Sequence, residues 1–133
     1  MSLAVIDASV LAVFYAADDP PHSLVADRLK VGDALFAPAH LDAEIVSALR
    51  GMARKNRALD RVVPSVLAQL AGFPIQRFPL PPLLERMSEL RHDITAYDAT
   101  YVALAERLGA ALITCDARLA TAIGPNCTFD KIT

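Results

Sequence analysis

Several residue types that stabilise small secreted proteins are scarce in this sequence of 133 residues. It has no tryptophan and only two cysteines, Cys115 and Cys127, which form neither a CxxC pair nor a zinc-knuckle spacing. Such cysteines indicate reduced thiols rather than a disulfide framework. No apolar run approaches the roughly 20 residues that cross a bilayer, and no cationic segment precedes the first apolar stretch as in a secretory signal. We therefore expect a cytoplasmic protein without a membrane segment.

An excess of basic charge, typical of nucleic-acid-binding proteins, is also missing. Thirteen lysines and arginines stand against 15 aspartates and glutamates, for a formal net charge of −2. Taken alone, this balance argues against a nucleic-acid partner. The basic residues are unevenly distributed, however. Five of them fall within twelve positions, namely Arg50, Arg54, Lys55, Arg57 and Arg61.

The length and the apolar content indicate one domain, spanning residues 1–133. A chain of this size buries roughly two-thirds of the surface that it exposes when unfolded, which is enough for a core without disulfides. Its hydrophobic content of 54% exceeds the usual value of about 45–50%. We interpret part of the surplus as an interface, for example in a homodimer.

Short apolar runs alternate with segments of helical periodicity. The runs predict strands at 3–6, 34–37, 75–78, 111–114 and 127–129. Helices are predicted at 9–17, 22–30, 42–55, 59–71, 82–91 and 96–108. This alternation is typical of an α/β domain with a central, mainly parallel sheet of four or five strands flanked by helices.

Two of the predicted helices carry apolar side chains at helical spacing. We expect these side chains to face the core. They are Leu41, Ile45, Leu49 and Met52 in one helix, and Tyr97, Tyr101, Leu104 and Leu108 in the other.

Four acidic residues stand where strands end or helices begin. Asp7 and Asp116 follow predicted strands, and Glu44 and Asp98 fall in the first turns of predicted helices. Each has a sufficient structural explanation, because such residues cap helices or interact favourably with the helix dipole. However, the carboxyl ends of parallel strands meet at one edge of a sheet. The four side chains are therefore expected in one cleft.

Clustered carboxylates repel one another, which raises their pKa values unless cations compensate. Oxygen ligands of this kind suit Mg²⁺ or Mn²⁺ rather than zinc. His40 and His92 fit no zinc-binding spacing, and we expect both at the surface or in loops. Two bound Mg²⁺ ions would change the formal charge from −2 to +2, so the acidic composition does not exclude an RNA partner. Arg50 and Arg54, on the helix that carries Glu44, are candidate RNA contacts, with an ordinary solvated helix face as the alternative.

In order and spacing, these residues resemble a PIN domain of the VapC toxin type. The resemblance is carried by "VIDASVLA", "AEIVSALR" and "AYDATYVALAERLGAALITCDARL", and it spans residues 3–129. It implies a three-layer PIN-like fold and a metal-dependent endoribonuclease, the toxin of a toxin–antitoxin pair. Family members commonly form dimers and are inhibited by a small antitoxin of the VapB type, whose C-terminal segment enters the active-site groove.

The resemblance also implies roles for individual residues. Asp7, Glu44, Asp98 and Asp116 would form the acidic quartet that holds Mg²⁺ or Mn²⁺, with Ser9 and Thr114 as hydroxyls hydrogen-bonded to the carboxylates or to water. Asp7 and Asp98 would make most of the direct metal contacts, Asp116 would hold a second position and Glu44 would orient the attacking water. Water activated by the metal would then cleave the RNA phosphodiester bond.

Two other functions remain open from the residues alone. A small phosphohydrolase could use Asp7 as its nucleophile, but such enzymes place a second aspartate where this chain has Ser9. Alternatively, they place a lysine after a late strand, but Lys55 is the only lysine between Val31 and Lys131. A PIN-like module that only binds RNA or protein is the other alternative. A cysteine nucleophile is disfavoured because no histidine lies near Cys115 in the sequence.

Overall fold

The centre of the molecule is a parallel sheet of five strands. The structure is a computed structural model and describes residues 2–132. The strands are β1 (Leu3–Ile6), β2 (Ala34–Pro38), β3 (Ile75–Phe78), β4 (Ala111–Thr114) and β5 (Phe129–Lys131). Their order is β3-β2-β1-β4-β5, and every neighbouring pair is parallel. The strand order therefore reverses direction between β1 and β4, where open α/β sheets usually bind ligands.

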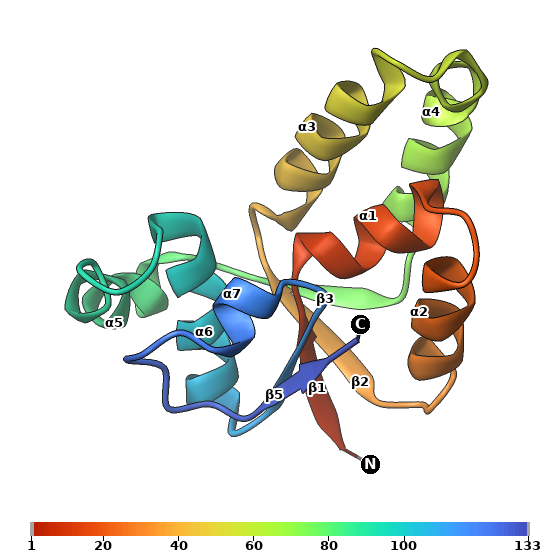
Figure 1. Ribbon diagram of the computed structural model, residues 1–133. Helices are drawn as coiled ribbons and strands as arrows, with labels where there is room; N and C mark the ends of the chain where they lie inside the picture. The colour runs from red at the N-terminus through yellow and green to blue at the C-terminus, as the bar shows by residue number, and fades with distance from the viewer. Residues whose placement is uncertain (1, 133) are drawn as a thin grey trace.

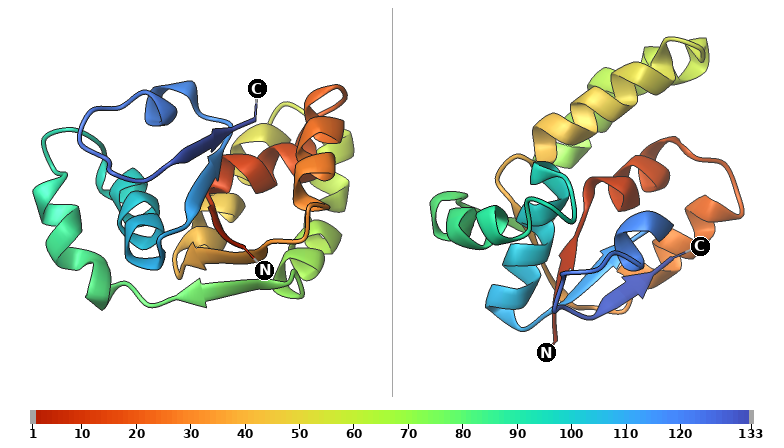
Figure 2. Two further views of the ribbon diagram at one scale, coloured as in Figure 1. Left: turned by 90° about the horizontal axis from the view of Figure 1, so that it is seen from below. Right: turned by 60° about the vertical axis from the view of Figure 1, so that its left-hand side comes forward.

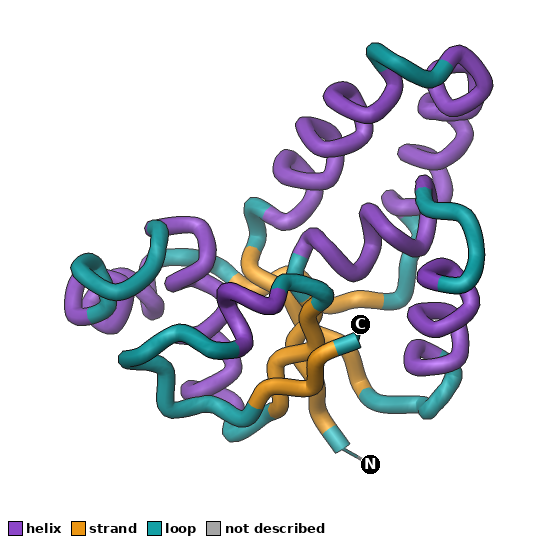
Figure 3. The backbone as a smooth tube through the Cα atoms, viewed as in Figure 1, coloured by secondary structure: helices purple, strands orange, loops and turns teal. Residues whose placement is uncertain are grey.

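The helices connect these strands (Figures 1 and 3). They are α1 (Ala8–Ala16), α2 (Pro21–Leu29), α3 (Leu41–Ala53), α4 (Arg57–Ala71), α5 (Leu84–Glu89), α6 (Ala96–Leu108) and α7 (Ala117–Ala120), with a 3₁₀ turn η1 (Pro81–Leu83). Helix α7 was not predicted, because a single turn is too short to show periodicity. No helix among residues 2–132 is both long and apolar enough for a membrane span.

The helices form layers on both faces of the sheet, as predicted. Figure 2 shows α5 and α6 on one face and α1 and α2 on the other. Helix α6 packs against β1, β2 and β4, while α1 packs against β4, α2 and α3. Helices α3 and α4 pair with each other and project beyond the sheet (Figure 1). The predicted α/β class and its parallel sheet are confirmed.

Local sequence explains where several helices begin and end. The side chains of Asp7, Asn56, Thr95 and Asp116 accept hydrogen bonds from backbone N–H groups in the first turns of α1, α4, α6 and α7. These bonds satisfy donors that a helix leaves without partners at its start. Helix α6 ends at Gly109, whose φ of 62° lies in the left-handed region that favours glycine.

The apolar side chains that were expected to face the core on α3 and α6 do so except at two positions. Leu41, Ile45 and Leu49 are fully buried, but Met52 is 42% exposed because the outer part of α3 lies on the projecting helix pair. Tyr101 is buried, whereas Tyr97 is 64% exposed. Tyr97 lies in the first turn of α6 and lines a surface pocket.

The last predicted strand was placed two residues too early. Strand β5 covers Phe129–Lys131, and its pairing joins Leu112 to Phe129 and Thr114 to Lys131. The apolar residue Cys127 lies in the preceding loop. The charged residues of β5 conceal it in the sequence, but charge is common on edge strands.

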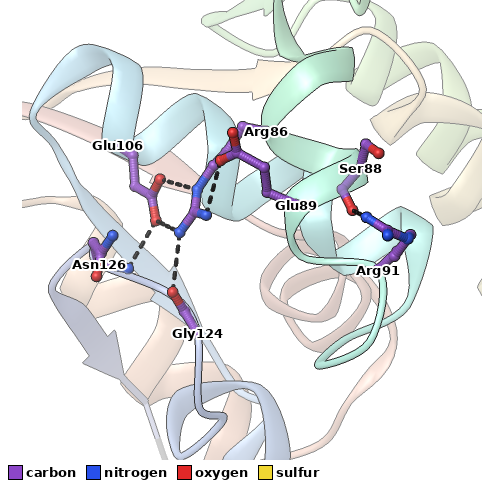
Figure 4. Close-up of polar contacts among 7 residues, drawn as sticks. All are labelled: Arg86, Ser88, Glu89, Arg91, Glu106, Gly124 and Asn126. Atoms are coloured by element: carbon purple, nitrogen blue, oxygen red, sulfur yellow. Dashed lines mark hydrogen bonds and ion pairs between the residues drawn. The ribbon is translucent and has the colours of Figure 1, made fainter.

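Arg86 of α5 connects three parts of the chain (Figure 4). Its Nε donates to Glu106 of α6 at 2.7 Å, and its Nη2 donates to the carbonyl of Gly124 at 3.0 Å. The backbone N–H of Asn126 donates to the same Glu106 carboxylate at 2.7 Å. This network fixes the loop before β5 against the helix that carries Asp98.

Candidate active site

The fold brings the ends of the acid-bearing elements to one edge of the sheet. Asp7 follows β1, Asp116 follows β4, and Glu44 lies in the first turn of α3 after β2. Only two residues separate the end of α6 from the start of β4, so α6 runs back along the strand and its first turn, with Asp98, lies at the edge where β4 ends. The expected convergence on the carboxyl edge agrees with this topology.

Two hydroxyl groups hold the Asp7 carboxylate, one just after β1 and one at the end of β4. Ser9 donates to Asp7 Oδ1 through its backbone N–H at 3.0 Å and its hydroxyl at 2.5 Å. Thr114 Oγ1 donates to Asp7 Oδ2 at 2.5 Å. These hydrogen bonds to both carboxylate oxygens fix the orientation of the Asp7 side chain. Ser9 and Thr114 thus lie where the sequence predicted hydroxyls beside a carboxylate.

The same hydroxyls hold the turn after β4. Ser9 Oγ accepts from the N–H of Cys115 at 3.0 Å, and Thr114 Oγ1 accepts from the N–H of Asp116 at 3.0 Å. Asp7, at 5% exposure, is one of three buried polar residues among those described. Burial raises the pKa of Asp7 from 3.8 to about 6, although the hydrogen bonds from Ser9 and Thr114 oppose the shift.

Glu44 has two protein partners that were not predicted. His40 Nε2 lies 2.5 Å from Glu44 Oε1, and the Tyr101 hydroxyl donates to the same oxygen at 3.0 Å. Thr100 Oγ1 gives its proton to the carbonyl of Tyr97, so it can only accept from His40 Nε2 at 3.2 Å. His40 Nε2 therefore carries a proton and donates to both acceptors.

The side chain of His40 does not lie freely at the surface, as was expected from the sequence. Its backbone lies in the turn before α3, as predicted, but its side chain is only 16% exposed and contacts Glu44. His92 lies exposed in a turn, as predicted. The four-residue spacing of His40 and Glu44 could have revealed the pair, because residues four apart are neighbours on a helix. Sequence spacing could not have revealed the hydrogen bond between Tyr101 and Glu44, because these residues are 57 positions apart in the chain.

Asp98 and Asp116 are electrostatic neighbours. Burial and the negative charge of Asp116 raise the pKa of Asp98, and the positive charge of Arg118 opposes this. Neither acid has a cation within 4.0 Å among residues 2–132, and the same holds for Asp7. The described part of the chain also contains no group of three histidine, cysteine or acidic side chains placed to share one metal ion.

Known proteins resemble this chain over nearly its whole length. Residues 4–123 match the family described as "PIN domain". Ribonuclease VapC12 of Mycobacterium tuberculosis is 39% identical over 128 residues, which cover 96% of this chain and 98% of that protein.

The chain belongs to the PIN-domain family, among the VapC ribonucleases.

Further relatives and structures agree with this membership. Ribonuclease VapC3 of the same organism is 39% identical, covering 89% of this chain and 85% of that protein. The crystal structure of PAE2754 from Pyrobaculum aerophilum has a TM-score of 0.65 at 24% identity, with 90% and 83% of the two chains covered. That of M. tuberculosis VapC20, described as a sarcin-ricin loop cleaving toxin, has a TM-score of 0.62 at 20% identity, with 82% and 86% covered. The predicted family and ribonuclease class are confirmed.

The two arginines predicted to contact RNA line a cavity that contains none of the four predicted site acids. Arg50 and Arg54 line a cavity of about 380 Å³ between α3 and α4, together with Arg57 and Asp60. At 1.5 Å per residue, Arg54 lies roughly 15 Å along the helix from Glu44. Arg118, which sequence analysis did not select, is the cation whose charge acts on Asp98.

Proposed function

We propose that this VapC-type PIN domain is a Mg²⁺- or Mn²⁺-dependent endoribonuclease whose metal site is formed by Asp7, Glu44, Asp98 and Asp116. The observation that supports the proposal is that the elements bearing these acids end or begin at the carboxyl edge of the sheet. Among residues 2–132, no cationic side chain lies within 4.0 Å of Asp7, Asp98 or Asp116. Such an arrangement raises the energy of the folded protein unless a cation binds there.

The residues fit a hard divalent cation. Mg²⁺ is usually bound through one or two carboxylates, while water and substrate phosphates complete its coordination. A group of three protein ligands is therefore not required. Asp7 and Asp98 would make the direct contacts, and Asp116 would complete the site.

The protein's own residues would position the reactants. A bound divalent cation would lower the pKa of water and stabilise the charge that develops on the phosphate. Ser9 and Thr114 would keep Asp7 in one orientation, as hydrogen bonds to metal-binding side chains generally do. Glu44, held by His40 and Tyr101, would accept a hydrogen bond from the attacking water. Burial and the nearby charge of Asp7 raise the pKa of the Cys115 thiol, which gives a cysteine nucleophile no support.

Family membership also supports proposals about partners and location. The proposed substrate is RNA, and the proposed inhibitor is a VapB-like antitoxin whose C-terminal segment enters the acidic edge. We also propose a homodimer and a cytoplasmic location. Arg50, Arg54 and Arg118 are proposed to contact RNA phosphates.

The test is cleavage of RNA by the purified chain. With Mg²⁺ or Mn²⁺, the wild type should generate new RNA ends, and EDTA should stop the reaction. Asp98→Asn should lower the rate by at least a hundredfold. Asp27→Asn, which alters an exposed acid that pairs with Lys30 at 3.9 Å, is the matched control and should cleave normally. Full metal-dependent cleavage by Asp98→Asn would refute the assigned site.

A further inference from the structure

A pocket lies next to the acidic edge, between α3 and the first turn of α6. Its volume is about 460 Å³, within the range of small-ligand sites. It is lined by His40, Ala43, Glu44, Ser47, Ala48 and Tyr97. Because Glu44 lines the pocket and Tyr97 directly precedes Asp98 in the chain, the pocket adjoins the proposed cleavage site.

The pocket exists because one face of α3 carries small side chains. Ser47 and Ala48 follow Ala43 by four and five positions, about one helical turn, and these small side chains leave space where larger ones would fill the groove. Tyr97 stands on the opposite side, with its ring centroid 5.7 Å from that of His40. One wall of the pocket is therefore aromatic, and Ser47 provides a hydroxyl that can both donate and accept hydrogen bonds.

Tyr97 is unusual within this molecule. Among residues 2–132 it is the only aromatic side chain in the set of exposed large hydrophobic residues. An exposed ring beside a phosphate-cleaving site is suited to stacking on an unpaired base, which is how proteins commonly hold single-stranded RNA.

We propose that this pocket binds one unstacked nucleobase of the RNA, next to the phosphodiester bond that is cleaved. The base stacks on Tyr97, and Ser47 contacts its polar edge, so the pocket contributes to the choice of cleavage site. This inference rests on the proposed ribonuclease function and assigns a substrate-recognition role to residues outside the acidic quartet.

The test compares variants of two pocket residues. Tyr97→Ala removes the stacking ring, and Tyr97→Phe keeps it. Ser47→Leu fills the pocket, while Ser65→Leu places the same side chain on the exposed surface of α4 as the matched control. Tyr97, Ser47 and Ser65 are all exposed, so these changes do not disturb the core.

Each variant is given a pool of randomised 12-nucleotide single-stranded RNAs with Mg²⁺, and the cleaved ends are sequenced. We expect Tyr97→Ala and Ser47→Leu to weaken the base preference at one position beside the cut. They should raise KM by about tenfold, as the loss of a stacked base does, with a smaller change in kcat. Tyr97→Phe should keep the base preference, and Ser65→Leu should match the wild type.

A binding measurement separates this inference from the proposed function. Fluorescence anisotropy with labelled six-nucleotide RNAs in EDTA reports binding without cleavage. If the wild type cleaves no RNA, the proposed function is wrong, and binding by the variants still tests the pocket. An unchanged base preference and unchanged binding in both Tyr97→Ala and Ser47→Leu would overturn the inference. If these variants weaken only the complex with the antitoxin, the pocket binds protein and the inference is wrong.

Discussion

The carboxylate of Asp7 has a structural function before any ligand is considered. It caps α1 by accepting the N–H of Ser9, and it joins β1 to β4 through Thr114. The cost of this position is a buried charge without a cation within 4.0 Å among the described residues. A neutral side chain of the same shape would cap the helix without that cost. Folding alone therefore does not explain the charge of Asp7, and the proposed binding of a divalent cation would.

Replacement of Asp7 by asparagine should stabilise the metal-free protein at neutral pH. The carboxyl of Asp7 titrates near 3.8 when unfolded and at about 6 when folded. Between these values the folded state binds more protons, so the free energy of unfolding falls as pH rises. Above pH 6 the charge costs about 3 kcal/mol, whereas the lost hydroxyl bond of Thr114 costs about 1 kcal/mol. Urea unfolding in EDTA at pH 7.5 should show a net gain for Asp7→Asn of about 1–3 kcal/mol.

The pH dependence provides the control for this prediction. At pH 4.5 most folded wild-type molecules carry a protonated Asp7, so the advantage of Asp7→Asn should largely disappear. Taking the difference between the two proteins removes the contributions of other groups that titrate in both. A difference in stability that stays constant from pH 4.5 to pH 7.5 would contradict a raised pKa at Asp7.

His40 should affect activity through Glu44. His40→Ala removes the donor at 2.5 Å from the Glu44 carboxylate and leaves Tyr101 as its partner. Loss of a residue that orients a metal-site side chain usually lowers activity or metal affinity by about 10–100-fold. We expect kcat for RNA cleavage to fall within this range, and His40→Gln to restore part of it by donating from its amide. His92→Ala, which changes an exposed histidine, should have no effect, and equal kcat values for the two alanine variants would refute the role.

At the scale of the elements, the sequence correctly predicted those helices, strands and caps that depend on interactions between residues close together in the chain. Strands β1 and β3, helix α6 and the cap at Asp7 were predicted from apolar runs and capping residues. The exposure of Tyr97 and the contact of Tyr101 with Glu44 were not, because they depend on how α6 packs against α3. Strand β5 was misplaced because its charged residues are stabilised by distant partners, such as the Arg28 bond to Asp130 at 2.6 Å.

The loop before β5 contains a glycine at which a side chain would be strained. Gly124 has a φ of 111°, and a Cβ atom there would lie 2.7 Å from Asp93 Oδ2. Gly124→Ala should therefore lower the free energy of unfolding by about 1–3 kcal/mol. Gly51→Ala is the matched control, because a Cβ at Gly51 of α3 meets no atom within 4 Å. It should raise stability by up to about 1 kcal/mol, and thermal unfolding of both variants with the same sign of change would contradict this account.

At the scale of the whole molecule, the acidic edge links folding, charge and ligand binding. The assignment of residues 1–133 to a single domain stays a prediction, although one hydrophobic cluster connects the sheet with helices from both of its faces. The net charge of −2 is small, so cations bound at the acidic edge would determine whether the molecule as a whole attracts or repels RNA.

Divalent cations should stabilise the folded protein even when no RNA is present. A ligand that binds only the folded state at a hundredfold excess over its Kd adds about 2.7 kcal/mol to the free energy of unfolding. We expect Mg²⁺ or Mn²⁺ to raise the Tm of the wild type by several degrees in differential scanning calorimetry. The effect should be smaller at pH 5 than at pH 7.5, because protons compete for Asp7. Asp98→Asn should lose most of the shift while Asp27→Asn keeps it, and an equal shift in both would show that the cation binds elsewhere.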